Sequence, residues 1–278
     1  PTTILCRQLF LCFKKRLGLF GFSVGHVSRL SKHNIKTMSL FISGGMDVLV
    51  GTHGIIKNNE ALKAASLIIV DEEHRFGVEQ KERILEFSPS CHFLSMSATP
   101  IPRSLQLSIS GVRNISTLFS PPISRKPVIT NIYYFNKALV KSSVYSEISR
   151  GGQVYVVDNS VDNVLFLFSF LKDCFPFFNI ASLFSSKNKR EINSTMESFR
   201  SGKIQILVST VIIESGIDIP SANTIIINNA HLFGLSQLHQ LRGRVGRSSS
   251  QAFAFLFVPK SKKTSPQALA RLKSIQRH

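Results

Sequence analysis

The sequence predicts an α/β protein made of two tandem lobes, each built around a parallel sheet. Three observations carry this prediction. Short apolar runs of strand length recur along the 278 residues, segments with helical spacing lie between them, and a proline-rich stretch divides the series. The apolar runs carry Val, Ile, Leu and Phe on both faces, which is typical of strands buried between two layers of helices.

The predicted strands are short and rich in β-branched and large apolar side chains. They are Met46–Val50, Leu67–Val70, His92–Met96, Val154–Val157, Gln205–Val208, Thr224–Ile227 and Ala252–Phe257. Apolar residues at helical spacing predict helices over Val78–Phe87, Lys137–Ser149 and Glu191–Phe199. Because strands alternate with helices, we expect the sheets to be parallel.

The boundary between the lobes is predicted within Phe119–Pro127, where three prolines stand close together. Proline lacks the backbone N–H and fixes φ, so this stretch can be neither regular helix nor central strand. A strand-like run, Val128–Phe135, follows, and Gly151-Gly152 then opens the second strand series. We therefore expect a first lobe over residues 1–122 and a second lobe over residues 123–278.

The composition favours a folded chain with a polyanionic partner. Lys and Arg number 34 against 16 Asp and Glu, and nucleic acid is the commonest partner of so basic a chain. The alternative is residue usage in the source, because Phe, Lys, Ser, Asn and Ile are frequent throughout. The four cysteines form no CxxC pair, which favours reduced thiols and a cytoplasmic location. No apolar run is long enough to span a bilayer, so we expect no membrane partner.

An acidic run, Asp71-Glu72-Glu73-His74, follows the predicted strand that ends at Val70. Parallel sheets bind their ligands at the carboxyl ends of their strands. Nucleotide hydrolysis needs one carboxylate to hold hydrated Mg²⁺ and another to orient the attacking water. Asp71 suits the first role, Glu72 suits the second, and His74 can relay the nucleotide state. The alternative is a solvated acidic loop after a core strand.

Hydroxyl residues follow other predicted strands at the same kind of position. Ser97 and Thr99 come directly after one strand and can hydrogen-bond the acidic run. Ser209 and Thr210 follow another, where hydroxyl groups suit contacts to DNA phosphates.

Two further runs repeat this pattern. In the first lobe, Gly51-Thr52-His53 ends a strand in small and polar groups that can hold a phosphate. In the second lobe, polar residues that suit the nucleotide cleft or its coupling to DNA follow Thr210. They are Glu214, Gly216 and Asp218.

A basic run with regularly placed glycines lies near the end of the chain, from Gln240 to Arg247. Glycine lets the backbone come close to a neighbouring element. The guanidinium groups of Arg244 and Arg247 can stabilise negative charge on a transferring γ-phosphoryl group. The alternative is an exposed basic turn that contacts phosphates or water only.

Taken together and in this order, the runs resemble the motifs of the superfamily 2 helicases and translocases, over essentially the whole chain. Pro1–Leu5 resembles motif Ia, Val50–His53 motif Ib, Asp71–Val78 motif II, Ser97–Arg103 motif III, Ser209–Pro220 motif V and Gln240–Arg247 motif VI. The resemblance implies two RecA-like lobes, ATP and Mg²⁺ as cofactors, and double-stranded DNA as a partner.

The same resemblance implies roles for single residues. The catalytic residues would be Asp71, Glu72, Arg244 and Arg247, with Mg²⁺ held by Asp71 through water. ATP binding and coupling would fall to His74, Ser97, Thr99, Glu214, Gly216, Asp218 and Gln240. DNA binding would fall to Thr2, Thr3, Gly51, Thr52, His53, Ser209 and Thr210.

Two groups within the superfamily have similar residues in these motifs. Arg75–Val78 and Phe233–Gln240 resemble both the transcription-repair coupling factors and the RecG-type branch-migration helicases. Ile213–Ile227, Gly151–Tyr155 and Ala252–Ala254 look closer to the coupling factors. That resemblance implies ATP-driven translocation on double-stranded DNA, displacement of stalled RNA polymerase and recruitment of excision-repair proteins, the last two through regions outside this chain. The alternatives are a RecG-type branch-migration helicase and a non-catalytic DNA-binding remnant.

The sequence also departs from the family pattern. No G-x-x-x-x-G-K-[ST] phosphate loop occurs in it, and in the family that loop precedes motif Ia. We therefore expect a first lobe truncated at its N-terminus, in a piece of a longer polypeptide that alone hydrolyses ATP poorly or not at all. Phe184-Ser185 replace a His-Gly pair, and Leu9 replaces a histidine. The Phe-rich segment Leu165–Lys189 is expected to contribute little to DNA binding.

Overall fold

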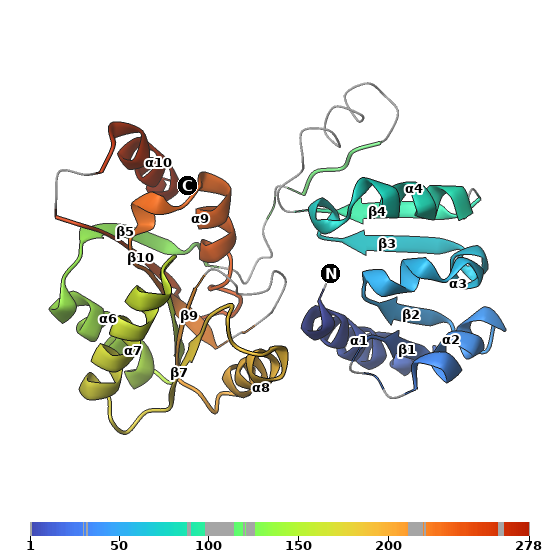
Figure 1. Cartoon of the computed structure of the whole chain (residues 1–278), viewed down its shortest axis with the longest axis horizontal. Helices are drawn as coiled ribbons and strands as arrows, with labels where there is room; N and C mark the ends of the chain where they lie inside the picture. The colour runs from blue at the N-terminus through green and yellow to red at the C-terminus, as the bar shows by residue number, and fades with distance from the viewer. Residues whose placement is uncertain are drawn as a thin grey trace. The chain divides into compact units, whose positions relative to one another are not determined.

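A computed structural model of the chain describes residues 2–29, 31, 33–87, 90–97, 114–118, 120, 126–210, 219, 221–260 and 264–277. Within them the chain forms two compact units, one that ends at Thr117 and one that begins at Leu118 (Figure 1). The sequence analysis placed the boundary between residues 122 and 123. Each unit is described by itself below.

The first unit alternates helices with short strands. Its helices are α1 (Thr3–Leu17), α2 (Asn34–Ile42), α3 (Asn59–Ala64) and α4 (Val78–Phe87), and its strands are β1 (Val24–Val27), β2 (Val48–Gly51), β3 (Leu67–Asp71) and β4 (His92–Met96). Short 3-10 turns join them: η1 (Gly18–Phe20), η2 (His53–Lys57) and η3 (Glu73–Arg75). In the described residues, β1 pairs with β2 and β3 with β4, both in parallel.

The two faces of the β3–β4 pair differ in their surroundings. Ile68 and Val70 of β3 and Phe93 of β4 point to one face, where they belong to a core with Leu62 and Ile84 from α3 and α4. Alternate residues of a strand point to opposite faces.

The other face of this pair carries large apolar side chains that are 44–54% exposed: Leu67, Ile69, Leu94 and Met96. We call these four residues the open face. The prediction that these strands are buried between two layers of helices is therefore wrong, because the elements that pack on them in the described residues cover one face only.

The second unit has a larger sheet. Its strands are β5 (Ile129–Tyr134), β6 (Gln153–Val157), β7 (Ile180–Leu183), β8 (Ile206–Ser209), β9 (Ala222–Ile227) and β10 (Phe253–Val258). Its helices are α6 (Lys137–Ser149), α7 (Val161–Cys174), α8 (Lys189–Arg200), α9 (Leu235–Arg242) and α10 (Pro266–Arg277), with a turn η4 (Ala230–Leu232). The six-stranded sheet has the order β5-β10-β9-β6-β8-β7, and all its pairs are parallel.

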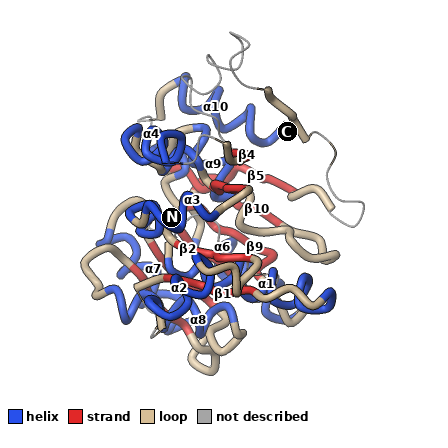
Figure 2. The backbone as a smooth tube through the Cα atoms, turned by 90° about the vertical axis from the view of Figure 1, so that its right-hand side faces the viewer, coloured by secondary structure: helices blue, strands red, loops and turns tan. Residues whose placement is uncertain are grey.

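Helices pack on both faces of this sheet (Figures 1 and 2). On one face, Val154 and Val156 of β6 form a core with Val144 of α6 and Leu171 of α7. On the other face, Tyr155 packs edge-on against Phe199 of α8, with ring centroids 5.1 Å apart. Strands β6, β8 and β9 are buried along their whole length. In this unit the prediction of strands between two helical layers is confirmed.

Most predicted elements lie where the sequence placed them. The bounds of α4, α6 and β4 agree with the prediction, and the remaining predicted strands and α8 differ from it by no more than two residues at either end. The elements that the sequence analysis did not predict are strands β1 and β7 and helices α1, α2, α3, α7, α9 and α10.

Candidate nucleotide and DNA sites

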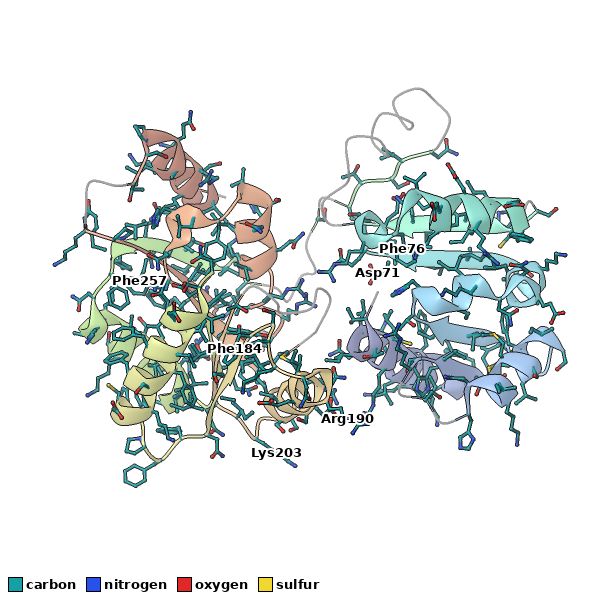
Figure 3. All side chains as sticks on the ribbon, viewed as in Figure 1. Asp71, Phe76, Phe184, Arg190, Lys203 and Phe257 are labelled. Carbon is teal, nitrogen blue, oxygen red and sulfur yellow. The ribbon has the colours of Figure 1, made fainter. Side chains whose placement is uncertain are left out.

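The predicted acidic site lies in a tight turn at the carboxyl end of β3. Asp71 is the last residue of the strand, and its Oδ1 accepts a hydrogen bond of 2.9 Å from the backbone N–H of Glu72. Glu72 has a left-handed backbone, with φ of 55° and ψ of 51°. Residues other than glycine rarely adopt this conformation, and it clusters at functional sites. Figure 3 labels Asp71 and Phe76 at this end of the strand.

The third carboxylate of the run has a structural partner. Glu73 is buried, and its Oε1 accepts a hydrogen bond of 2.9 Å from the Nζ of Lys81 on α4. Phe76 packs against the core that α4 shares with β3. These contacts of Glu73 and Phe76 hold the turn against α4. They leave Asp71 and Glu72 as the two carboxylates of the run for which these contacts give no structural role.

The structure places Ser97 beside this turn. The register of the parallel pair sets Asp71 opposite Met96, so Ser97 follows at the same edge as Glu72. This agrees with a site shared by the two strand ends. Thr99 and the side chain of His74 lie outside the described residues.

A second predicted group gathers at the carboxyl ends of β1 and β2. The thiol of Cys6 on α1 lies 3.8 Å from the carbonyl oxygen of Val27 and 3.6 Å from that of Val50. The backbone N–H of Cys6 donates to the carbonyl of Thr2, whose hydroxyl caps the helix by accepting from the N–H of Leu5 at 3.3 Å. The first turn of α1 is thereby held against the two strand ends.

The predicted DNA-binding residues of the first unit therefore come together. Thr2 and Thr3 begin α1, while Gly51 ends β2 and is followed by Thr52 and His53. The N–H of Thr52 donates to the Val27 carbonyl of β1 at 3.3 Å. Hydroxyl groups and backbone amides at one sheet edge are suited to contacts with DNA phosphates.

Sequence reasoning missed a charged group at this edge. Ser28 and Arg29 directly follow β1, and the side-chain amide of Asn34 binds both the N–H (3.2 Å) and the carbonyl (2.8 Å) of Ser28. Arg29 is exposed. The signal was a polar and basic pair after an apolar run, but Gly25 and His26 interrupt that run and hid the strand.

In the second unit, the predicted hydroxyl residues lie at the carboxyl end of β8. Ser209 is 2% exposed and Thr210 is 6% exposed, and neither hydroxyl oxygen has a hydrogen-bond partner within the described part of the chain. The N–H of Thr210 donates to the Leu183 carbonyl of β7 at 3.0 Å, and the N–H of Asp158 donates to the Ser209 carbonyl at 3.1 Å. Buried hydroxyl groups are usually bonded, so a pair left open at a sheet edge is suited to an acceptor or donor from a ligand.

The loop next to Thr210 carries positive charge. It runs from Phe184, directly after β7, to the start of α8, and Figure 3 labels Phe184 and Arg190 in this part of the unit. The Nζ of Lys187 lies 5.3 Å from the Phe184 ring centroid and 2.6 Å from Oε1 of Glu191. The sequence analysis expected little DNA contact from this segment, and the fold brings the loop next to the open hydroxyl groups.

A buried carboxylate orders the strand ends of the same sheet. Asp158 is fully buried after β6, and its Oδ1 accepts from the N–H of Ser160 (2.8 Å) and the amide of Asn163 (3.0 Å). Its Oδ2 accepts from the side-chain amides of Asn228 (2.7 Å) and Asn229 (3.0 Å). Both oxygens are thus occupied, and the network fixes the turn after β9 that leads to α9.

The arginines of the basic run differ in their surroundings. Arg247 is exposed, and its Nε donates to the Gly243 carbonyl at 3.3 Å. Arg244 is buried beside Tyr155, where its positive charge opposes the effect of burial, which raises the pKa of the tyrosine. Arg242, for which the sequence predicted no catalytic role, donates from Nη1 to the Ile275 carbonyl of α10 at 2.9 Å. Gln240 lies on α9.

Gly246 shows why this run needs glycine. Its φ is +75°, a conformation that side chains with a Cβ rarely adopt. An added Cβ would also lie 3.1 Å from side-chain carbons of Ala252 and Val128.

The residues predicted for the nucleotide cleft or its coupling to DNA, Glu214, Gly216 and Asp218, lie outside the described residues.

The donor set around Asp71 fits Mg²⁺ bound to a nucleotide. No group of three or more His, Cys, Asp and Glu side chains in the described residues could hold a metal ion. Magnesium in phosphoryl-transfer sites needs fewer protein ligands, because water and phosphate oxygens complete its octahedron. One Asp71 oxygen receives the Glu72 N–H, and the carboxylate otherwise suits this role.

No helix among the described residues combines the length and apolar character needed to cross a membrane.

Comparisons with protein families match two models in tandem. The DEAD/DEAH box helicase model matches residues 1–107, and the helicase conserved C-terminal domain model matches residues 136–249. The fold class predicted from the sequence, two tandem RecA-like α/β lobes, is thereby confirmed.

Individual relatives give a narrower match. The chain is 42% identical to the transcription-repair-coupling factor of Helicobacter pylori over 278 residues, which is 100% of this chain and 28% of that protein. It is 40% identical to that of Escherichia coli, covering 99% of this chain and 24% of that protein. A solved structure of RecG bound to a three-way DNA junction matches 99% of this chain and 37% of that chain, with a TM-score of 0.78 and 32% identity.

The coupling factors named above are more similar in sequence to this chain than the RecG protein is, as the wording of the motifs indicated. The chain spans about a quarter of the length of these curated relatives. It carries the tandem helicase region in which all the predicted motifs lie. Over its whole length, the chain is similar to a segment of the transcription-repair coupling factors, and it carries two helicase domains in tandem.

Proposed function

We propose that this chain is the motor core of an ATP-dependent translocase on double-stranded DNA, within a transcription-repair coupling factor. In the complete protein, the motor displaces stalled RNA polymerase and promotes DNA repair through regions outside this chain. The observation that supports this most directly is the placement of the predicted residues. The acidic turn and three groups of hydroxyl residues all lie at the carboxyl edges of parallel sheets, where α/β proteins bind ligands.

The nucleotide roles follow from the chemistry of each side chain. Asp71 would hold Mg²⁺ through water, and Glu72 would orient the attacking water. Arg244 and Arg247 stabilise charge on the transferring phosphoryl group. Coupling between nucleotide state and DNA falls to His74, Ser97, Thr99, Glu214, Gly216, Asp218 and Gln240. ATP supplies the phosphoryl group, and Mg²⁺ neutralises its charge when both are bound.

The DNA roles belong to the hydroxyl and amide groups at the strand ends. Thr2, Thr3, Gly51, Thr52 and His53 contact the backbone from the first unit. In the second unit this role falls to Ser209 and Thr210. Arg29 adds a positive charge to the first group, and Lys187, which is ion-paired with Glu191, lies in the loop next to the second. Such contacts are independent of base sequence and weaken as salt rises.

The test of DNA binding uses Thr210, because its hydroxyl can be removed without breaking a hydrogen bond in the described residues. Thr210→Val should weaken binding of a labelled linear duplex about fivefold, the worth of roughly one hydrogen bond. Thr130→Val is the matched control, since it also removes a buried hydroxyl, one that bonds the Val128 carbonyl in β5. Fluorescence anisotropy at several salt concentrations measures both.

Two results would count against this assignment. Duplex affinity that does not change between low and high salt would exclude binding through phosphates. Equal affinities of Thr210→Val and the wild-type chain, with Thr130→Val also unchanged, would remove Thr210 from the DNA contact.

A separate prediction concerns ATP hydrolysis by these 278 residues. They contain no G-x-x-x-x-G-K-[ST] loop, whose amides and lysine hold the β- and γ-phosphates. We expect phosphate release from ATP at the background rate, with and without duplex DNA, in a coupled-enzyme assay. Robust DNA-stimulated turnover would contradict this expectation.

The second candidate is a branch-migration helicase, favoured by the fold match to RecG on a three-way junction. A non-catalytic DNA-binding remnant is less consistent with the sequence, because pure binding requires neither Asp71 and Glu72 nor Arg244 and Arg247. Anisotropy with a three-way junction and a linear duplex of equal length separates the first two. Strong preference for the junction would favour the branch-migration function.

A further inference from the structure

A row of aromatic rings extends from the core of the second unit to its edge strand. Phe253, Phe255 and Phe257 of β10 and Tyr133 of β5 point to the same face, because the parallel register sets Phe257 opposite Tyr133. Phe257 is fully buried, whereas Tyr133 is 39% exposed. Ile129, at the other end of β5 on this face, is 45% exposed. The core covers the inner end of the row and leaves its outer end open.

The rings of Phe253, Phe255 and Tyr133 are inclined to their neighbours in the row by 25° or less. Phe253 and Phe255 have centroids 6.2 Å apart and planes inclined by 22°, and Tyr133 and Phe255 are 6.3 Å apart and inclined by 25°. The guanidinium of Arg150 lies 5.3 Å from the Phe253 centroid. An ion pair with the buried Glu147 holds Arg150 in this position. The row is therefore a set of aligned π-faces with a planar cation at one end.

A polar group lies within the same row. Asn131 stands between Ile129 and Tyr133 on β5, opposite Phe255 in the register, and it is half-buried. Its side-chain amide makes no hydrogen bond with any residue in the described ranges. An amide offers both donors and an acceptor, as recognition of the edge of a nucleobase requires.

Packing alone explains only part of this arrangement. Aromatic residues are frequent in strands and account for the buried Phe257. They do not account for a half-exposed tyrosine beside an open amide and an ordered guanidinium. Proteins that bind single strands stack unpaired bases on aromatic rings and guanidinium planes on a sheet face. The net charge of +18 favours a polyanion as the occupant.

We propose that Tyr133, Phe253 and Phe255, together with Asn131 and Arg150, form an aromatic strip that binds unpaired bases of single-stranded nucleic acid. The contact is to bases, so it differs in chemistry from the proposed phosphate contacts to duplex DNA. It also uses different residues. The strip can therefore fail as a binding site while the proposed duplex binding stands, and the reverse is equally true.

The test compares two neighbouring tyrosines on opposite faces of β5. Tyr133→Thr removes a ring from the strip, and Tyr134→Thr removes one from the other face, where Tyr134 is 63% exposed. Threonine suits a strand, so both variants should fold, which far-UV circular dichroism checks. The probes are a fluorescein-labelled oligothymidylate of about 12 nucleotides, within the size range of known single-strand sites, and a duplex of equal length.

We expect Tyr133→Thr to weaken oligothymidylate binding about tenfold, the worth of one stacked base, and to leave duplex binding unchanged. Tyr133→Phe keeps the ring and should bind like the wild type, as should Tyr134→Thr. Failure of the wild-type chain to bind the oligothymidylate would overturn the proposal and would leave the strip as a protein contact or as packing. Equal losses in Tyr133→Thr and Tyr134→Thr, or a parallel loss of duplex binding in Tyr133→Thr, would also overturn it.

Discussion

At the scale of single residues, burial decides which side chains are chemically available. Cys6 is enclosed between α1 and the ends of β1 and β2, and burial raises its pKa to about 11. The reactive form of cysteine is the thiolate, so a raised pKa lowers its reactivity at neutral pH. Cys12, two turns further along the same helix, is exposed.

These two thiols make a prediction about alkylation. In the folded chain at pH 8, iodoacetamide should modify Cys6 roughly a hundredfold more slowly than Cys12, because the Cys6 thiolate is scarce below its raised pKa. The rate at Cys6 should rise as the pH approaches that pKa. Peptide mass spectrometry after timed quenching measures both rates. Equal rates in the folded chain would contradict the burial of Cys6, and equal rates after denaturation serve as the control.

The acidic turn shows how far the sequence reaches at this scale. Position after a buried strand was enough to predict Asp71 and Glu72 as the candidate pair. The sequence could not show that Glu73 has a structural partner, since that partner lies outside the run. Only the fold shows that Lys81 binds Glu73 and that Glu72 has a left-handed backbone. The ion pair depends on the position of α4, which lies outside the run.

At the scale of elements, apolar runs predicted most strands but not their environment. An apolar run such as Leu67–Val70 predicts a strand, but the pattern does not indicate whether helices cover one face of the sheet or both. The prediction therefore succeeded for β6 and failed for β3, where one face is open. Coverage is a tertiary property, and pattern alone does not determine it.

The missed strand β1 has a different cause. Its four residues include Gly25 and His26, so the apolar run falls below the length that a pattern can detect. In the fold, parallel pairing with β2 forms the strand that the local pattern does not predict. Glycine is needed at position 25, because an added Cβ would lie within 2.8 Å of side-chain atoms of Met46 and Thr37. Arg29 was missed along with the strand, because its candidacy depends on following a strand end.

At the scale of the whole chain, each unit has its own hydrophobic core. Leu62 belongs to the core of the first unit and Leu171 to that of the second, and both are buried. The two cores share no residue. The chain has no tryptophan, and its four tyrosines all lie beyond Leu118, so tyrosine fluorescence reports on the second unit only.

This arrangement makes a prediction about unfolding. Leu171→Ala should lower the urea midpoint seen by tyrosine fluorescence, through a loss of about 2–5 kcal/mol in the free energy of unfolding. Leu62→Ala should cost a similar amount in the first unit and leave that midpoint in place. Far-UV circular dichroism, which reports on both units, should detect both changes. A fluorescence midpoint that moves equally in the two variants would show that the units unfold as one.

The open face of β3 and β4 has a consequence for handling the chain in solution. Four large apolar side chains exposed together form a hydrophobic patch, and such patches promote aggregation. The charge of +18 opposes that through mutual repulsion between molecules. Added salt limits the range of this repulsion to about 10 Å at 0.1 M. The salt expected to weaken the proposed DNA contacts therefore also weakens the repulsion between protein molecules. Dilute protein and light-scattering controls at each salt step therefore belong in every binding titration of this chain.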